Sequence, residues 1–493
     1  MGALKPGMSQ KMVKETSRAN QPGFPVSIDF IFLRVRTLAT RIEPWQRTPR
    51  PCRHPRMPLA IQDPGHKSVS IWSIASSHAA MVLVALALRL AVVGFLYPER
   101  LDPDRDHWRF AGETGRIARS IVRGRGFCSP LHADTGPTAW MTPIYPYILA
   151  GVFKVFGVYT KASAVAMLAL DSFFSALTCI PVFLIARKSF GEPAAIWAGW
   201  AWAFFPYAIY FSADFIWATT LTTLILALVF LMALRLERSS GFVVWAGFGA
   251  LCGVAALTDP IILSFAPLLA LWMCWRRFAQ RRAWFGPGLA AALAFLAVVS
   301  PWFARNYRVF HTFIPFRDNL GLELYVGNNG NTWHFAPGGF HPSDTEREWR
   351  EYQRVGELAY MRHKKEQALD YISSHRGEFV VLSLRRALYM WTNFWSFSPR
   401  YLEAEPLDPP NIFLCTALTI LALAGLWRSF RLGFSIAMPY AIALFLFPVV
   451  YYITHPEDYY RRPIDPIFVV LAAYWLAGHV GNKKPESIPG TVL

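Results

Sequence analysis

Charged residues are scarce in this chain, and the acidic ones are the scarcer sign. Of its 493 residues only 16% are Asp, Glu, Lys or Arg, whereas 54% are hydrophobic. A soluble globular domain carries about 25% charged residues. The composition therefore excludes a soluble globule and predicts an all-α polytopic membrane protein.

Several motifs that define common membrane and soluble enzymes are also missing. The chain has no GxxxxGK[ST] run and no glycine-rich fingerprint after a strand, so it supports neither an ATP-driven pump nor a nucleotide-sugar domain. It shows no internal repeat. Its six cysteines have no CxxC spacing and predict neither a disulfide framework nor a metal centre; they stand at positions 52, 128, 179, 252, 274 and 415.

The basic residues stand mostly at the ends of apolar segments. The formal net charge of +17 could indicate nucleic-acid binding, but this placement is what membrane topology requires of Lys and Arg, so we expect no nucleic-acid partner. Ten segments approach the roughly 20 apolar residues of a transmembrane helix. They are residues 71–97, 162–186, 193–212, 215–234, 241–258, 260–275, 284–303, 411–427, 434–454 and 464–480.

These spans predict the domain organisation and the orientation. Residues 1–70 form a disordered cytoplasmic tail, 71–303 an N-terminal transmembrane module with a first loop at 98–161, 304–410 a second loop region, and 411–493 a C-terminal transmembrane module. With the tail inside, every alternate short connection is basic and both large loops are extracytoplasmic. Two further apolar segments, 138–157 and 378–397, are predicted to lie in the membrane interface, and 344–374 is expected to be a solvent-exposed helix.

The first loop combines carboxylates and arginines at helical spacing in LDPDRDHWRFAGETGRIARSIVRGRGF. A helix from about His107 puts one stripe of side chains on a single face: Asp106, Phe110, Glu113, Ile117 and Ile121. The neighbouring stripe is Arg109, Arg116 and Arg123. Acids flanked by cations suit acid/base chemistry beside a phosphate. The alternative is an ordinary membrane-surface helix whose Asp104 or Asp106 caps its N-terminus.

Three other groups of polar residues are predicted on the same, extracytoplasmic face of the membrane. Residues 304–331 gather cations and amides suited to phosphate and sugar, namely Arg305, Asn306, Arg308, Arg317, Asp318, Asn328 and Asn329. Residues 454–466 contribute His455, Glu457, Asp458, Tyr459, Tyr460, Arg461, Arg462 and Asp465. Asp259 lies in LTDP. The alternatives for the first group are interfacial anchoring by its arginines and a tight turn at GNNGN. The alternative for residues 454–466 is a loop of mutually neutralising ion pairs, and the alternative for Asp259 is a turn at a helix end.

From about Val82 to Ala477 the sequence resembles the GT-C class of integral-membrane glycosyltransferases, which includes protein O-mannosyltransferases and lipid A aminoarabinose transferases. The resemblance rests on these motifs, in this order: GETGRIARSIVRGRGF with TPIYPYILAGVFKVFG, LTDP, PWFARNYRVFHTFIPFRDNLGLELYVGNN and YYRRPIDP. Family members use a first-loop acid as the catalytic carboxylate, often in an Asp-Glu pair before a Tyr. Here Gly112 precedes Glu113 and no Tyr follows, so the base remains open between Glu113 and Asp106, with His107 contributing.

The resemblance implies an inverting sugar transfer from a polyprenyl-phosphate donor to a lipid, glycan or protein acceptor, at the extracytoplasmic face of the cytoplasmic membrane. We expect four arginines to hold the departing lipid phosphate: Arg305, Arg308, Arg461 and Arg462. The remaining expected substrate-binding residues are His107, Asn306, Asn328, Asn329 and Tyr460. Some members use a divalent metal ion; the sequence demands none, although His107, His455 and the loop acids could supply ligands.

The rival hypothesis is a non-catalytic transporter or flippase of a lipid-linked saccharide. Such a protein places ionisable groups near the middle of the bilayer, often in repeated halves. Only Asp171 and Arg89 are predicted to lie deep in this chain, and matching halves are absent. Arg89 is expected to reach the surface or a polar cavity, and a structural ion pair between Asp171 and Arg89 is the simplest account of both.

Overall fold

The computed structural model describes residues 76–95, 110–237, 239, 241–332, 340–343, 345–393, 395, 408–457 and 459–480. The chain divides into two units, Met1–Lys67 and Ser68–Leu493, and every described residue belongs to the second. The predicted cytoplasmic tail therefore lies outside the described residues. Within them the structure is helical, and the β pairing is limited to an isolated bridge between Cys128 and Pro137. The predicted all-α class is confirmed.

Each predicted span is present as one helix or as two consecutive helices. They are α3 (His78–Phe95), α7 (Lys161–Leu177) with α8 (Cys179–Phe190), α9 (Glu192–Ala203) with α10 (Pro206–Asp214), α11 (Ala218–Leu236), α12 (Phe242–Thr258), η2 (Pro260–Ser264) with α13 (Ala266–Ala279), α14 (Phe285–Phe310), α20 (Asp408–Leu432), α21 (Phe434–Leu446) with α22 (Val449–Ile453), and α23 (Asp465–Val480). Among the described residues, five helices are long and apolar enough to cross a membrane: Lys161–Phe190, Ala218–Leu236, Phe285–Phe310, Pro409–Leu432 and Phe434–Ile453.

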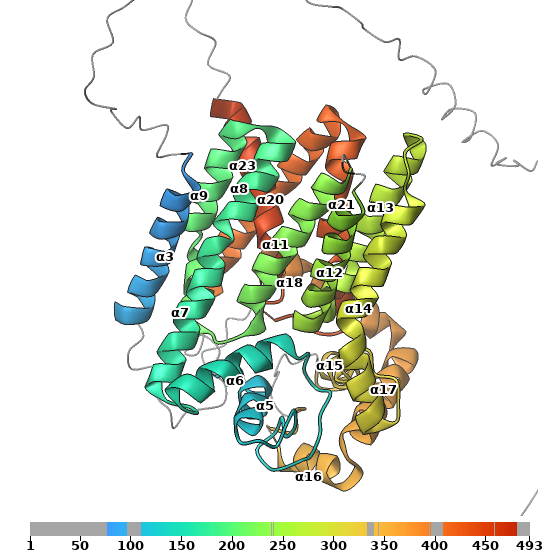
Figure 1. The fold of residues 1–493 in the computed structure, drawn as a ribbon. Coiled ribbons are helices and arrows are strands. Elements are labelled where there is room, and N and C mark those ends of the chain that lie inside the picture. The colour runs from blue at the N-terminus through green and yellow to red at the C-terminus, as the bar shows by residue number, and fades with distance from the viewer. Residues whose placement is uncertain are drawn as a thin grey trace, which may run out of the picture. The chain divides into compact units, whose positions relative to one another are not determined.

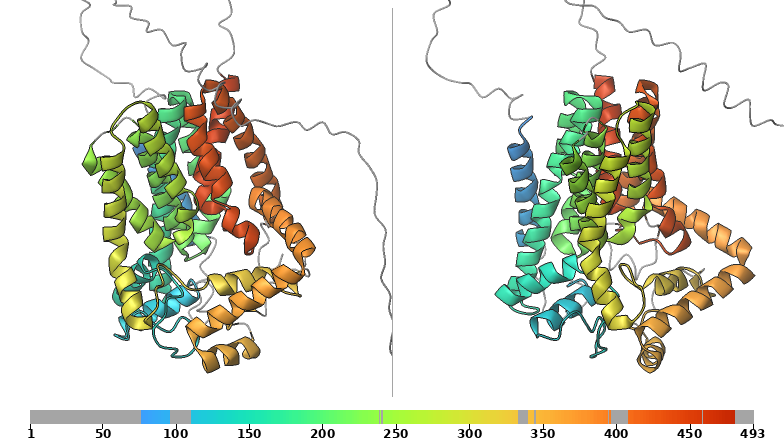
Figure 2. Two further views of the ribbon diagram at one scale, coloured as in Figure 1. Left: turned by 90° about the vertical axis from the view of Figure 1, so that its right-hand side faces the viewer. Right: turned by 45° about the vertical axis from the view of Figure 1, so that its right-hand side comes forward.

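The helices between the spans gather at one end of the bundle (Figures 1 and 2). They are α5 (Glu113–Val122), α6 (Ile144–Phe156), α15 (Leu320–Gly327), α16 (Glu346–Val355), α17 (Glu357–Ser374) and α18 (Arg376–Thr392). The elements α6 and α18 occupy the two segments predicted to lie in the membrane interface. The exposed helix predicted at 344–374 is two helices, because the chain turns at Gly356 with a φ of +80°.

The connections rich in basic residues lie at the other end of the bundle. The last turns of α8, α11, α13 and α20 end in arginine or lysine: Arg187, Lys188, Arg235, Arg276, Arg277 and Arg431. In Figure 1 these helix ends lie at the top, whereas α5, α15, α16 and α17 lie at the bottom. These four helices therefore place basic last turns at the same end of the bundle, and the side of the membrane on which that end lies stays a prediction.

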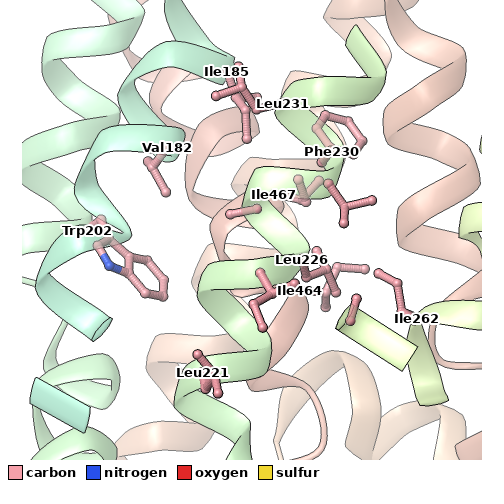
Figure 3. Packing of buried hydrophobic residues seen from close by; sticks show 14 of the residues in the cluster. Val182, Ile185, Trp202, Leu221, Leu226, Phe230, Leu231, Ile262, Ile464 and Ile467 are labelled. Carbon is pink, nitrogen blue, oxygen red and sulfur yellow. The ribbon is translucent and has the colours of Figure 1, made fainter. Parts of the chain in front are cut away.

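The centre of the bundle is packed around α11. Figure 3 shows Leu226 and Phe230 of α11 among Val182, Ile464 and Ile467, which come from α8, η4 (Arg462–Ile464) and α23. All of them are buried to at least 98%. Beside this core, a Cβ atom at Gly249 of α12 would collide with the backbone of α14. A glycine is needed there because the two helices pack backbone to backbone.

Arg89 and Asp171 are both fully buried, but the predicted ion pair between them is wrong. Arg89 donates to Ser175 Oγ at 2.8 Å and to the carbonyls of Trp202 and Ala203 at 3.3 and 3.1 Å. In a continuous helix the Trp202 carbonyl would accept from residue 206, which is a proline without an N–H. Asp171 instead accepts a hydrogen bond from Tyr145 Oη at 2.8 Å. The guanidinium therefore satisfies a helix end inside the bundle instead of a carboxylate.

Arg89→Met should destabilise the protein because it leaves the buried Ala203 carbonyl at the end of α9 without a donor and removes the hydrogen bond to Ser175 Oγ. Each unsatisfied buried group costs about 1–3 kcal/mol, so the thermal midpoint in detergent should fall clearly. Arg187→Gln is the matched control: its ion pair with Glu192 is exposed, with 56% and 44% of the side chains accessible, and should contribute about 1 kcal/mol or less. Equal midpoints for the two variants would contradict this role of Arg89.

Candidate functional site

Glu113 is the first residue of α5, and the described residues directly before it, Phe110 to Gly112, form a turn. Ala111 and Gly112 have positive φ values of 61° and 46°, which end any helix that approaches from the N-terminal side. The predicted continuous helix is therefore wrong at Phe110 to Gly112: Phe110 lies in a turn and shares no helical stripe with Glu113, while His107 to Arg109 lie outside the described residues. The Glu113 side chain is buried, and its Oε1 lies 3.4 Å from Nε2 of His341.

The other candidate base, Asp106, lies outside the described residues, as do His107 and Arg109. Their roles stay predictions. The structure does show how Glu113 is held. Its partner His341 packs edge to face against Trp140, with ring centroids 5.3 Å apart, and Trp140 belongs to the first loop. The carboxylate is thus enclosed by the first and second loops.

Arg305, near the end of α14, forms hydrogen bonds to the first loop. Its guanidinium donates to the carbonyls of Phe127 and Thr138 at 2.8 and 2.7 Å and to Asn306 Oδ1 at 2.8 Å. These carbonyls flank the bridge between Cys128 and Pro137. The predicted role as a phosphate ligand is untested, and the observed contacts describe a residue that positions the loop.

The amides predicted to bind sugar hydroxyls also contact the backbone. Asn306 Nδ2 donates to Ile314 O at 2.9 Å, and Asn328 Nδ2 donates to Leu324 O and Ile453 O at 2.8 and 2.9 Å. Asn329 Nδ2 donates to Tyr325 O at 2.8 Å. Arg308 is exposed near the end of α14. These contacts hold Asn306 against the loop after α14 and Asn328 and Asn329 against α15, and the sugar-binding role of these residues stays a prediction.

Arg461 and Arg462 share one buried carboxylate, that of Asp465 at the start of α23. Arg461 Nε lies 2.8 Å from Asp465 Oδ1, and Arg462 Nη1 lies 2.9 Å from Oδ2. All three side chains are at most 5% exposed. Two guanidinium groups and one carboxylate leave one net positive charge, and the Nη2 atom of Arg461 is buried without a hydrogen-bond partner.

A cavity adjoins this charged group. Arg462 and Asp465 line it together with Ser175, Tyr207, Thr219 and Thr220. The guanidinium of Arg462 lies 3.3 Å from the centroid of the Tyr207 ring, and its Nη2 donates to Asn393 Oδ1 at 2.6 Å. The cavity thus combines a cation, hydroxyls and an aromatic wall, between α7, α10, α11 and α23.

Arg317 organises a second group of polar residues. Burial opposes its charge, but the carboxylates of Asp259 and Glu323 outweigh burial, so the pKa of Arg317 lies above its usual value. Tyr460 belongs to the same group, and its hydroxyl lies 3.1 Å from His455 Nε2. Asp259 also caps η2 by accepting from the N–H of Ile261 at 3.1 Å. Segments that the sequence separates, LTDP, RDNLGLE and THPED, therefore meet.

A buried pair of carboxyl groups, Asp318 and Glu357, joins the loops to α17. Glu357 accepts hydrogen bonds from Thr138 Oγ1, the N–H of Ala139 and Tyr352 Oη, at 2.6, 2.7 and 3.1 Å. Both carboxyl oxygens of Asp318 are buried without a hydrogen-bond partner, and Glu357 is the neighbouring carboxyl group. Burial and the charge of Glu357 raise the pKa of Asp318 well above its usual value. This shift favours the protonated form of Asp318.

The part of the chain that the structure describes contains no assembled set of metal ligands. No three side chains of His, Cys, Asp or Glu gather there as a cation site. His455 lies 3.4 Å from Glu323 and 3.9 Å from Glu457, and burial lowers its pKa. The predicted metal ligand His107 is outside the described residues.

Asp318→Asn should remove a pH-dependent loss of stability. Because the pKa of Asp318 is raised in the folded protein, the pair stabilises fully below the ordinary Asp pKa of about 4, and this contribution is lost as pH rises through the folded-state pKa. An asparagine amide donates to Glu357 at every pH. The thermal midpoint of Asp318→Asn should therefore match wild type near pH 4 and exceed it at pH 8.

The matched variant is Glu357→Gln, which puts an amide among three donors. It should be less stable than wild type by about 1–3 kcal/mol at every pH. A wild-type pH slope retained in Asp318→Asn would show that Asp318 does not hold the proton.

Comparison with solved structures gives distant likenesses. ArnT from Cupriavidus metallidurans bound to undecaprenyl phosphate is similar at 16% identity and a TM-score of 0.45, over 81% of this chain and 59% of that one. The archaeal oligosaccharyltransferase AglB from Archaeoglobus fulgidus, in complex with an inhibitory peptide and a dolichol-phosphate, is similar at 15% identity and a TM-score of 0.48, over 81% of this chain and 50% of that one. The chain thus spans less than two thirds of either protein.

No match is found among curated proteins. The family model for dolichyl-phosphate-mannose-protein mannosyltransferases matches residues 140–304. This stretch includes α6 to α13 and most of α14; it contains Asp259, which lies between α12 and η2, and it ends one residue before Arg305. The match confirms what the motifs predicted: this chain resembles the GT-C superfamily of integral-membrane glycosyltransferases.

Proposed function

We propose that the protein is a membrane glycosyltransferase that moves a sugar from a polyprenyl-phosphate carrier to an extracytoplasmic acceptor, with inversion at the anomeric carbon. The family match supports the class of reaction. The observation that carries the proposal is the buried group of Arg461, Arg462 and Asp465 beside a cavity. The Nη2 atom of Arg461 is buried without a hydrogen-bond partner, and an oxygen of an anionic headgroup would accept a hydrogen bond from it.

The departing lipid phosphate would lie against Arg462. As the acceptor oxygen bonds to the anomeric carbon, the bond from that carbon to the phosphate oxygen breaks, and negative charge develops on the phosphate. A fixed guanidinium in a medium of low polarity stabilises this charge more than water does. The hydroxyls of Thr219 and Thr220, which line the same cavity, could donate to the remaining phosphate oxygens.

A first-loop carboxylate would accept the proton of the acceptor hydroxyl. Glu113 is buried, and His341 lies within 3.4 Å of it; Asp106 remains the alternative. One carboxylate is sufficient for a single displacement, because the attacking oxygen approaches opposite the phosphate and no covalent enzyme intermediate forms.

The end of the bundle that carries α5 and α15 to α17 is proposed to be extracytoplasmic. The basic helix ends of α8, α11, α13 and α20 lie at the opposite end (Figure 1). Because cytoplasmic connections carry the excess of Lys and Arg, this arrangement supports a multi-pass protein of the cytoplasmic membrane. The transporter alternative gains no support, since Arg89 and Asp171 both have structural partners.

The base assignment is tested with single variants of the full chain in proteoliposomes. Released polyprenyl phosphate is measured with a lipid-linked sugar as donor. Loss of a general base lowers turnover about 10²- to 10⁴-fold, so Glu113→Gln or Asp106→Asn should show such a loss. Lys161→Gln, an exposed change at the start of α7, is the control. Turnover that persists when both carboxylates are replaced would refute the assignment.

Asp465→Asn should be the most destabilising change in the charged group. It leaves two buried guanidinium groups without their carboxylate, and removing one partner of a buried ion pair costs about 3–5 kcal/mol. Arg462→Gln should cost less, because Arg461 and Asp465 remain paired. Thermal midpoints in detergent measure both, and the reverse order would contradict the charge balance described above.

A further inference from the structure

A polar hollow at the C-terminal end of α5 plays no part in the chemistry proposed above. Arg119 and Ser120 of α5, Arg123 at its C-cap, and Arg125, Ser129 and His132 of the following loop line it. The only acid in its wall is Asp134. Three guanidinium groups therefore face one carboxylate, and the hollow has an excess of positive charge.

Asp134 does not neutralise this excess. Its carboxylate accepts from Ser129 Oγ at 2.8 Å and pairs with Arg125 at 3.0 Å. The bond from Ser129 and the proximity of Arg125 lower the pKa of Asp134. Among the described residues no carboxylate forms an ion pair with Arg119 or Arg123. The negative end of the α5 dipole favours a cation there, but it does not account for three around one hollow.

The wall of the hollow is held in place. Gly124 and Gly126 have φ values of +76° and +82°, conformations that glycine adopts at no steric cost. The N–H of Arg125 donates to Ser120 O at 3.0 Å, and that of Ser129 donates to Gly136 O at 2.9 Å. Arg305 binds the neighbouring carbonyls of Phe127 and Thr138. A loop fixed in this way is pre-organised for a ligand.

We infer that this hollow binds a phosphate group of the acceptor. Arginine forks match the tetrahedral oxygens of phosphate, and His132 supplies a further polar group in the wall. The hydroxyls of Ser120 and Ser129 already donate to Arg116 O and Asp134, so the arginines carry the binding. This inference rests on the proposed function, and it narrows the acceptor to a phosphorylated molecule, such as a phosphorylated glycan or glycolipid.

The position of the hollow fits an acceptor site. Ser120 follows Glu113 by seven residues on the same face of α5, which corresponds to about 10 Å along the helix. Arg116 lies between them and donates to Pro130 O at 3.3 Å. A phosphate bound at the C-terminal end of α5 would leave a hydroxyl of the same molecule within reach of the carboxylate.

The test is a titration of the full chain in phosphatidylcholine nanodiscs with inorganic phosphate, followed by ³¹P NMR. Arg119→Gln with Arg123→Gln should weaken saturable binding at least tenfold. Lys154→Gln with Lys161→Gln removes two exposed charges from the neighbouring α6 and α7 and should change binding less than twofold. Equal binding by the arginine variant, or no saturable binding by wild type, would overturn the inference.

Two further experiments distinguish a phosphate of the acceptor from a phosphate of the bilayer, and a failure of this inference from a failure of the proposed transferase function. If phosphatidylglycerol nanodiscs abolish phosphate binding, a bilayer headgroup fills the hollow and the acceptor assignment is wrong. In the transfer assay, Arg119→Gln with Arg123→Gln should raise KM at least tenfold for a phosphorylated acceptor and leave it unchanged for the dephosphorylated one. Wild type that releases no polyprenyl phosphate would refute the proposed function, whereas the phosphate titration stands on its own.

Discussion

The buried group of Arg461, Arg462 and Asp465 is the constraint on which the account of the site depends. Two guanidinium groups and one carboxylate, all at most 5% exposed, leave a positive charge inside a helical bundle. Charges are removed from water at high cost unless they are paired. The protein tolerates this one beside a cavity, which is the arrangement expected where an anion is bound during function.

The two loops hold the rest of the site in place against this fixed charge. Arg305 binds carbonyls on both sides of the bridge in the first loop, and the pair of Asp318 and Glu357 joins Thr138 to α17. His341, from the second loop, contacts Glu113. Arg305, which the sequence predicts as a phosphate ligand, thus contacts the backbone of the first loop. These contacts hold the loops that carry Glu113 and the hollow at the end of α5.

Sequence periodicity and charge predicted the helices and the two ends of the bundle, because apolar length and the placement of arginine are local properties of the chain. The start of α5 was missed, since the positive φ of Ala111 depends on tertiary packing. Most partners of Arg89, Arg305 and Asn328 are backbone carbonyls, which every residue carries, so no sequence pattern reveals them. The sequence places Asp318 in a group with arginines. Its neighbour Glu357 stands 39 positions later (357 − 318), in a segment predicted to be a solvent-exposed helix, so the buried pair was not predicted.

The most direct measurement is the stabilisation of the reconstituted protein by polyprenyl phosphate. A ligand present at about 100 times its Kd raises the free energy of unfolding by about 2.7 kcal/mol, so the thermal midpoint of wild type should rise with lipid concentration. Arg462→Gln should need at least tenfold more lipid for the same rise, whereas Lys161→Gln should behave as wild type. An unchanged response of Arg462→Gln would show that the buried charge does not bind the lipid phosphate.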